Sequence, residues 1–197
     1  MKKSLVLLCA ALLLAGRMAK KPEQIPVPET EPTTAPAETA APLQEPQAAG
    51  EGLVFSAQTL DGETVSEAFF ADYDLTMVNI WASWCPPCVG ELGELGELYT
   101  KLPQNVGFLS LNIDEEQDMD AARALLSDNN CSFTCIKGLN SPGIQEGILS
   151  QVMYIPSTVF FDRQGNQVGE LVVGVPQGAD VAAAYMDEIN SRLSLLP

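Results

Sequence analysis

The stretch Val78-Asn-Ile-Trp-Ala-Ser-Trp-Cys-Pro-Pro-Cys-Val-Gly-Glu91 joins an apolar run to two cysteines that are separated by two prolines. The run at 76–82 has the length and the apolar content of a buried strand. Residues 86–102 carry apolar side chains at helical spacing. The sequence therefore predicts a strand that gives way to a helix, with Cys85 and Cys88 at the start of that helix.

The spacing of the two cysteines suits disulfide chemistry. Residues three apart in the first turn of a helix lie on one face, so Cys85 and Cys88 are within disulfide reach. At the helix N-terminus, free backbone N–H groups and the helix dipole stabilise a thiolate. The pKa of a thiol there falls from about 8.5 into the range of about 3.5 to 7.5. This pattern favours a redox-active Cys85–Cys88 pair, with Cys88 as the more shielded thiol.

Zinc binding and a plain structural disulfide are the competing interpretations of the pair. The chain has no histidine, and the spacing of Cys131 and Cys135 suits a second zinc-binding pair poorly. The acidic residues at 114–120 do not have the spacing of a calcium-binding EF-hand loop. We therefore expect neither a metal site nor a cofactor.

The rest of the chain predicts an α/β fold with a mixed central sheet flanked by helices. Segments 55–59 and 64–65 flank Asp61-Gly62, which is typical of a hairpin. Strands are expected at 106–113, 131–136, 158–162 and 167–173, and helices at 118–128, 143–150 and 180–195.

Two separated motifs resemble thioredoxin-family proteins of the TlpA and ResA type, within the redoxin or AhpC/TSA superfamily. One is the stretch at 78–91, and the other is Tyr154-Ile-Pro-Ser-Thr-Val-Phe-Phe-Asp-Arg-Gln-Gly165. The resemblance covers roughly residues 53–195. It implies a thioredoxin fold with an N-terminal β-hairpin extension and the activity of a thiol–disulfide oxidoreductase.

The resemblance implies catalytic roles for three residues. Cys85 matches the nucleophile and Cys88 the resolving cysteine. Glu91 matches an acid near the thiols, which would take or give a proton during resolution. The alternative for Glu91 is a first-turn carboxylate that is favoured only by the helix dipole.

The resemblance also implies a substrate-binding surface around the cysteines. Trp84, Pro86 and Pro87 form the active-site loop. Pro156 matches a proline that follows a cis peptide bond and packs against the cysteine pair. Ile155 would offer its backbone to an extended substrate segment.

Four positions depart from the pattern of the relatives. Asn79 stands where thioredoxin has a buried aspartate, so proton transfer would fall to Glu91 or to water. Pro86 replaces a glycine, Val89 a lysine and Gly93 a proline. These changes leave the reduction potential, and with it the direction of electron flow, open.

The N-terminal part of the chain predicts export. Residues 1–19 combine Lys2 and Lys3 with a 13-residue apolar run, which is too short to span a bilayer and is typical of a signal or anchor segment. Cleavage and retention both stay open. Arg17 stands where a lipoprotein would carry its lipidated cysteine, which excludes lipidation at that position. Residues 20–51 form an acidic, proline-rich segment, either a tether or an unstructured tail. The folded domain is expected at 52–197.

The charge of the chain and its other two cysteines in the folded part are less informative than the motif at Cys85 and Cys88. The chain has 26 acidic and 10 basic residues, which disfavours nucleic acid as a partner. In a regular strand, Cys131 and Cys135 would lie about 13 Å apart, so two free thiols are the default. A bend in an oxidising compartment would permit a second disulfide, and both readings stay open.

These features predict an extracytoplasmic disulfide reductase at a bacterial membrane. The resemblance implies that the substrates are protein disulfides, such as those of apocytochrome c during cytochrome c maturation or of a secreted methionine sulfoxide reductase. It also implies a membrane electron donor of the CcdA or DsbD type. A peroxiredoxin-like peroxidase is one alternative, although Ser83-Trp84-Cys85 lacks the Thr-x-x-Cys motif. A non-catalytic thioredoxin-fold binding module is the other.

Overall fold

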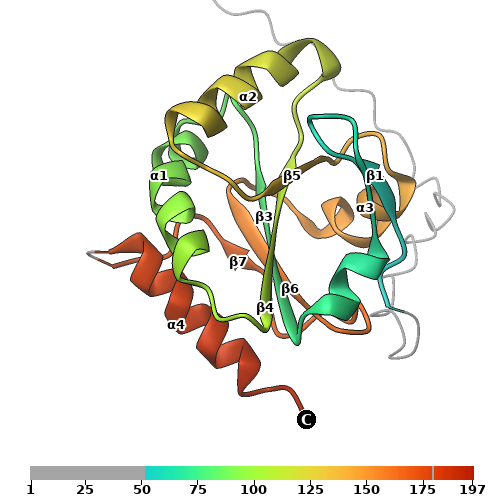
Figure 1. Ribbon diagram of the computed structural model, residues 1–197, viewed down its shortest axis with the longest axis vertical. Coiled ribbons are helices and arrows are strands. Elements are labelled where there is room, and N and C mark those ends of the chain that lie inside the picture. Colours follow the sequence, from blue (N-terminus) through green and yellow to red (C-terminus); the bar gives the residue numbers. More distant parts are fainter. Residues whose placement is uncertain (1–51, 179) are drawn as a thin grey trace, which may run out of the picture. The chain divides into compact units, whose positions relative to one another are not determined.

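The computed structural model describes residues 52–178 and 180–197. The predicted signal segment at 1–19 and the predicted linker at 20–51 lie outside these residues. The described part contains a five-stranded sheet with helices on both faces and a separate two-stranded hairpin (Figure 1). None of its helices is long and apolar enough to cross a membrane.

The sheet is mixed, with its strands in the order β5-β4-β3-β6-β7. β3, β4 and β5 run parallel, whereas β6 is antiparallel to β3 and to β7. β3 lies at the centre and is buried along its whole length. The cysteine pair follows the carboxyl end of β3, so it lies beyond the end of the central strand and not beside an outer one. The strands are β3 (Leu75–Trp81), β4 (Val106–Asn112), β5 (Thr134–Lys137), β6 (Ser157–Asp162) and β7 (Val172–Val173).

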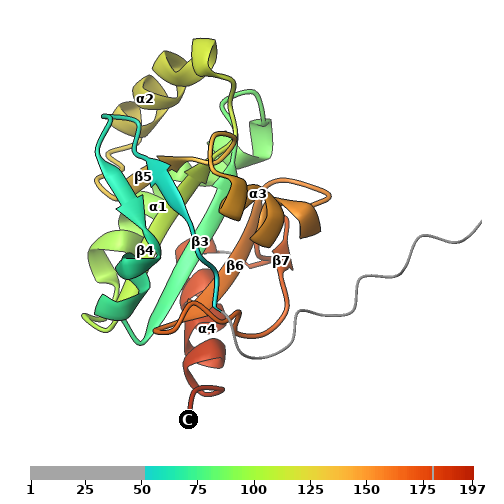
Figure 2. The same cartoon turned by 90° about the vertical axis from the view of Figure 1, so that its right-hand side faces the viewer.

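The helices are divided between the two faces of the sheet. α1, α2 and α4 cover one face, and α3 lies with the N-terminal hairpin on the other (Figures 1 and 2). Short 3-10 helices occupy residues 67–72, 116–118 and 149–151. The larger elements are α1 (Pro86–Lys101), α2 (Met119–Asp128), α3 (Pro142–Gly147), α4 (Val181–Leu193) and the hairpin strands β1 (Ser56–Gln58) and β2 (Thr64–Ser66).

The alternation of side chains along β3 creates two half-cores. Met77 and Trp81 pack on the side of α1 and α4, whereas Val78 and Ile80 pack on the side of the hairpin and α3. By the same alternation, Asn79 points toward α1 and α4. Asn79 is thereby placed among the largely apolar side chains of this layer.

Most of the predicted elements are present, including the hairpin, in which Gly62 adopts a φ of +89°. The predicted strand at 167–173 is wrong in its extent. Gln167 makes only an isolated bridge to Phe161, and β7 begins at Val172. Gly169 interrupts the strand with a φ of +74°, which breaks the extended backbone.

The strand predicted at 131–136 is also shifted. β5 begins at Thr134 and ends at Lys137. Asn130, with a φ of 56°, and the hydrogen bond from Cys131 N–H to the Leu126 carbonyl (2.9 Å) complete the end of α2. The first residues of the predicted strand are therefore used to leave the helix.

Candidate active site

Cys85 and Cys88 are joined by a disulfide at the N-terminus of α1, with their Cα atoms 5.3 Å apart. Cys85 is the N-cap residue, and its Sγ accepts a hydrogen bond from Cys88 N–H at 3.4 Å. Pro86 and Pro87 occupy the first helical positions, where a backbone N–H would have no acceptor within the helix. Cys85 is 4% exposed and Cys88 is fully buried, so Cys85 is the more accessible sulfur.

A buried carboxylate holds the loop that precedes the cysteines. Both oxygens of Asp114 lie 3.0 Å from Ser83 N–H. Asn112 donates from Nδ2 to Asp114 and accepts from the Asp114 backbone N–H, each at 3.0 Å. The end of β4 thus fixes the turn that carries Trp84 and Cys85.

The second sequence motif lies directly against the first. The Ile155–Pro156 peptide bond is cis, and the Ile155 carbonyl oxygen is 3.7 Å from Cys85 Sγ. Pro156 is buried, and its carbonyl accepts a hydrogen bond from Gly174 N–H at 2.8 Å. Strand pairing of β3 with β6 brings these distant segments together.

The segments just before Cys85 and Ile155 carry large, exposed apolar side chains. Trp84 is 64% exposed, and Met153 and Tyr154 are 83% and 69% exposed. Trp84 precedes Cys85, and the other two precede Ile155. The two loops that meet at the disulfide therefore present apolar surface to solvent, which is typical of a site that binds other molecules.

Glu91 is buried one helical turn after Cys88, with 2% of its surface exposed. Its Oε1 accepts a hydrogen bond from Asn79 Nδ2 at 3.0 Å. Its Oε2 accepts a hydrogen bond from the Tyr185 hydroxyl at 2.9 Å. Thr158 Oγ1 accepts from Asn79 Nδ2 at 3.3 Å and donates to the Tyr185 oxygen at 3.5 Å. The polar cluster therefore joins β3, α1, α4 and β6.

Burial sets the acidity of this cluster. Desolvation raises the pKa of Glu91, against the opposing effect of the hydrogen bonds from Asn79 and Tyr185. Desolvation and the nearby Glu91 also raise the pKa of Tyr185. A carboxyl whose pKa is raised above 4.5 by burial is a stronger base than an exposed one and is better suited to exchanging protons with thiols.

Comparison with known proteins decides the family. A family model described as the AhpC/TSA family matches residues 51–168, which is more than half of the chain. The chain belongs to the AhpC/TSA family. Sporulation thiol-disulfide oxidoreductase A of Bacillus subtilis is 26% identical over 137 residues, covering 68% of this chain and 79% of that protein. Thioredoxin-like protein YneN of the same bacterium is 28% identical over 145 residues, covering 72% of this chain and 75% of that protein.

Solved structures confirm the predicted fold. A thioredoxin-family thiol:disulfide interchange protein from Chlorobium tepidum matches with a TM-score of 0.58 at 21% identity, covering 73% of this chain and 95% of that chain. The fold of this AhpC/TSA-family chain is therefore the thioredoxin fold. Family, fold and the bonded cysteine pair together make it a thiol–disulfide oxidoreductase.

Three residues of the site were not singled out from the sequence. In the sequence, Tyr185 is indistinguishable from the other residues on the buried face of the last predicted helix, and Thr158 from the other residues of a buried strand. Asp114 reads as one member of a solvated acidic cluster. Only tertiary packing shows that these side chains contact Glu91, Asn79 and the Ser83 backbone.

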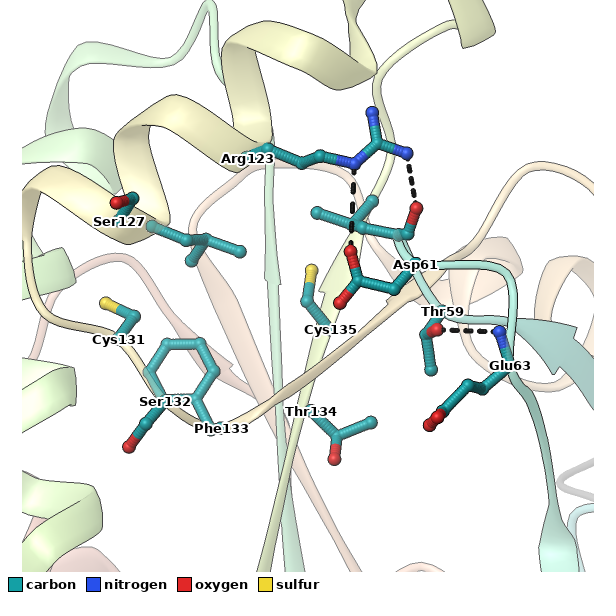
Figure 3. Close-up of a pocket in the computed structure, with 12 residues that line it drawn as sticks. Thr59, Asp61, Glu63, Arg123, Ser127, Cys131, Ser132, Phe133, Thr134 and Cys135 are labelled. Atoms are coloured by element: carbon teal, nitrogen blue, oxygen red, sulfur yellow. Dashed lines mark hydrogen bonds and ion pairs between the residues drawn. The ribbon is translucent and has the colours of Figure 1, made fainter.

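Cys131 and Cys135 are free thiols. The Cys131 thiol donates to the Leu92 carbonyl of α1 at 3.3 Å. Burial raises the pKa of Cys131 to about 11 and that of Cys135 to about 12. Both line a cavity of about 500 Å³, together with Phe133 and with residues of the hairpin turn and of α2 (Figure 3).

The described residues contain no group of three or more histidine, cysteine, aspartate or glutamate side chains that could hold a metal ion. The acidic residues at 114–120 are spread between one buried carboxylate, Asp114, and exposed positions such as Glu115 and Asp120.

Proposed function

We propose that the protein is an extracytoplasmic disulfide reductase that acts by exchange through Cys85 and Cys88. The observation that carries this proposal is the bonded pair at the N-terminus of α1, with the Ile155 carbonyl 3.7 Å from Cys85 Sγ. This arrangement places one sulfur at the edge of the surface and the other behind it.

In the proposed reaction, the Cys85 thiolate attacks a disulfide of the substrate and releases one substrate thiolate. The Cys88 thiolate then attacks Cys85 Sγ and releases the second one. The substrate gains two electrons, and the Cys85–Cys88 disulfide forms. The Cys88 N–H, which lies 3.4 Å from Cys85 Sγ, and the helix N-terminus stabilise the negative charge on Cys85.

Glu91 is the proposed proton acceptor for Cys88. Both residues lie on the buried face of α1, three positions apart, where side chains are neighbours. Because burial raises the pKa of Glu91, its carboxylate is a stronger base than an exposed glutamate. It takes the Cys88 proton during resolution and later gives it to the departing thiolate or to water.

The proposed substrates are proteins that present a disulfide in an extended segment. The backbone of Ile155 would pair with that segment, and Trp84 and the loop prolines Pro86 and Pro87 would flank it. Disulfides of apocytochrome c or of a secreted methionine sulfoxide reductase fit this class. Two electrons must then return to the pair, for which we propose a membrane donor of the CcdA or DsbD type.

The proposed location rests on the signal-like residues 1–19 and the proline-rich residues 20–51. An impermeant thiol reagent added to intact cells that express the full chain tests it. Labelling of Cys85, the more accessible thiol, is expected after mild reduction. Labelling only after the cells are lysed would contradict the outer location.

The catalytic proposal is tested by the reduction of insulin disulfides with dithiothreitol as the electron source. The wild-type chain is expected to accelerate the reaction, and Cys85→Ser is expected to abolish the acceleration. Reduced Cys88→Ser, added to insulin without dithiothreitol, is expected to stop after one mixed disulfide per molecule. Full activity of Cys85→Ser would overturn the proposal and favour a binding module instead.

A further inference from the structure

Four buried side chains, one of which is that of Glu91, form a closed ring of hydrogen bonds. In order, the ring runs from Asn79 to Glu91, Tyr185, Thr158 and back to Asn79, with distances of 3.0, 2.9, 3.5 and 3.3 Å. Each member comes from a different element, and none is more than 2% exposed. Bulk water therefore does not compensate for a change of charge on Glu91.

The groups that face Glu91 carry no positive charge. Asn79 from β3, Thr158 from β6 and Tyr185 from α4 are neutral, and Cys88 on its own helix is neutral as a thiol or as a disulfide. No salt bridge to Glu91 exists among the described residues. The ionised carboxylate thus depends on two donors, Asn79 Nδ2 and the Tyr185 hydroxyl.

The two hydroxyls of the ring are able to reverse direction. With Glu91 ionised, Thr158 donates to Tyr185 and Tyr185 donates to Oε2. With a proton on Oε2, Glu91 donates to the Tyr185 oxygen, and the Tyr185 hydroxyl turns to donate to Thr158 Oγ1. Oε1 accepts from Asn79 in both states. Only hydrogen atoms move, so the carboxyl and the tyrosine stay paired in either state.

We propose that Tyr185 is a positioning residue that controls the pH at which Glu91 and Cys88 exchange a proton. Thr158 accepts the hydrogen bond that the Tyr185 hydroxyl donates when Glu91 is protonated. This inference rests on the proposed function, because Glu91 must first act as the base for Cys88. The step is a proton transfer: the Cys88 thiol becomes a thiolate, and the Glu91 carboxylate becomes a carboxylic acid. The Cys88 thiolate then displaces the substrate thiolate from Cys85.

Two variants are expected to shift the titration of Glu91 in opposite directions. Tyr185→Phe removes a donor to the ionised carboxylate, so the pKa of Glu91 is expected to rise by about one further unit. Thr158→Val removes the acceptor that the Tyr185 hydroxyl needs when Glu91 is protonated, so the pKa is expected to fall. The carbon-13 NMR shift of the Glu91 carboxyl, followed against pH in the oxidised full chain, measures both shifts without any turnover.

The same change should appear in the resolution step. Reduced protein reacts with dithiobisnitrobenzoate in two phases: attack by Cys85 releases one chromophore, and attack by Cys88 releases a second. The rate constant of the second phase is measured against pH. In Tyr185→Phe, the acidic limb of this pH profile is expected to move up by about one pH unit, while the rate constant at high pH stays unchanged. In a Glu91→Gln background, Tyr185→Phe should change nothing further.

Tyr99→Phe is the matched control, because Tyr99 lies later on α1 and packs against Phe108 and Phe133. It should leave both the Glu91 titration and the second phase unchanged. Coinciding Glu91 titrations in wild type, Tyr185→Phe and Thr158→Val would overturn the inference while the proposed function stands. Absence of a second phase in the wild-type protein would instead overturn the proposed function.

Discussion

At the scale of single residues, the buried carboxyl of Glu91 couples stability to pH. Desolvation raises its pKa above 4.5 in the folded chain, so the folded state binds this proton more tightly than the unfolded state. The stability that this group contributes is therefore full below pH 4.5 and is lost as the pH rises through the folded-state pKa.

Glu91→Gln removes this titration. We predict that the free energy of unfolding of the oxidised wild-type protein falls, relative to that of Glu91→Gln, as the pH is raised from about 4 to about 8. Urea denaturation of both proteins at a series of pH values measures the difference. A difference that stays constant, or that grows in favour of the wild type, would contradict the burial argument.

The second pair of cysteines is expected to be chemically inert in the native protein. Burial raises the pKa of Cys131 to about 11, so its thiolate fraction at neutral pH is about a hundredfold below that of an ordinary thiol. Alkylation of Cys131 and Cys135 at pH 7 should be slower by at least that factor in the native protein than in urea. Peptide mapping by mass spectrometry measures both rates, and equal rates would show that the thiols are open to solvent.

At the scale of elements, α1 contains glycines in different surroundings. A Cβ at Gly90 would meet nothing within 4 Å, whereas one at Gly96 would lie 3.1 Å from the Asn129 carbonyl oxygen and 3.4 Å from that of Asn130. Gly90→Ala is therefore expected to stabilise the protein by about 1 kcal/mol through helix propensity alone.

Gly96→Ala makes the same gain in propensity but must displace the loop after α2. It should be less stabilising than Gly90→Ala, or destabilising. Thermal unfolding of the two variants in parallel measures this contrast. Equal stabilisation by both substitutions would mean that the loop does not resist the added methyl group.

The link between the end of β4 and the active-site loop is also expected to contribute to stability. Asp114→Ala leaves Ser83 N–H and Asn112 Nδ2 without their acceptor, which should cost about 2 kcal/mol. The exposed Asp72→Ala is the control for loss of one negative charge. Chemical denaturation measures both, and equal effects would show that the contacts of Asp114 add nothing.

The elements near Cys85 were predictable because each leaves a local signal in the sequence. The apolar run of β3, the helical spacing of α1 and the Asp61-Gly62 turn all report on neighbours in the chain. β7 was overestimated because the left-handed turn at Gly169 carries no hydrophobic signal. Of the ring, only Glu91 and Asn79 were predictable from the sequence, since Thr158 lies 79 residues from Asn79 and Tyr185 lies 94 residues from Glu91.

At the scale of the whole molecule, the two motifs are far apart in sequence and meet through sheet topology. β3 pairs with β4 on one side and with β6 on the other, so the cysteines at the end of β3 lie beside Ile155 and Pro156 at the start of β6. The same pairing sets Asn79 opposite Thr158. The central strand therefore positions both the sulfur atoms and Asn79, which donates a hydrogen bond to the Glu91 carboxyl.

The central claim is that Cys85 and Cys88 cycle between a dithiol and a disulfide. The most direct measurement equilibrates the full chain in glutathione buffers of graded redox ratio, quenches it by alkylation and counts the modified thiols by mass spectrometry. We predict that Cys85 and Cys88 lose and gain their labels together, at one midpoint, while Cys131 and Cys135 stay reduced throughout. A pair that remains fully alkylated, or fully bonded, at every glutathione ratio would contradict the account.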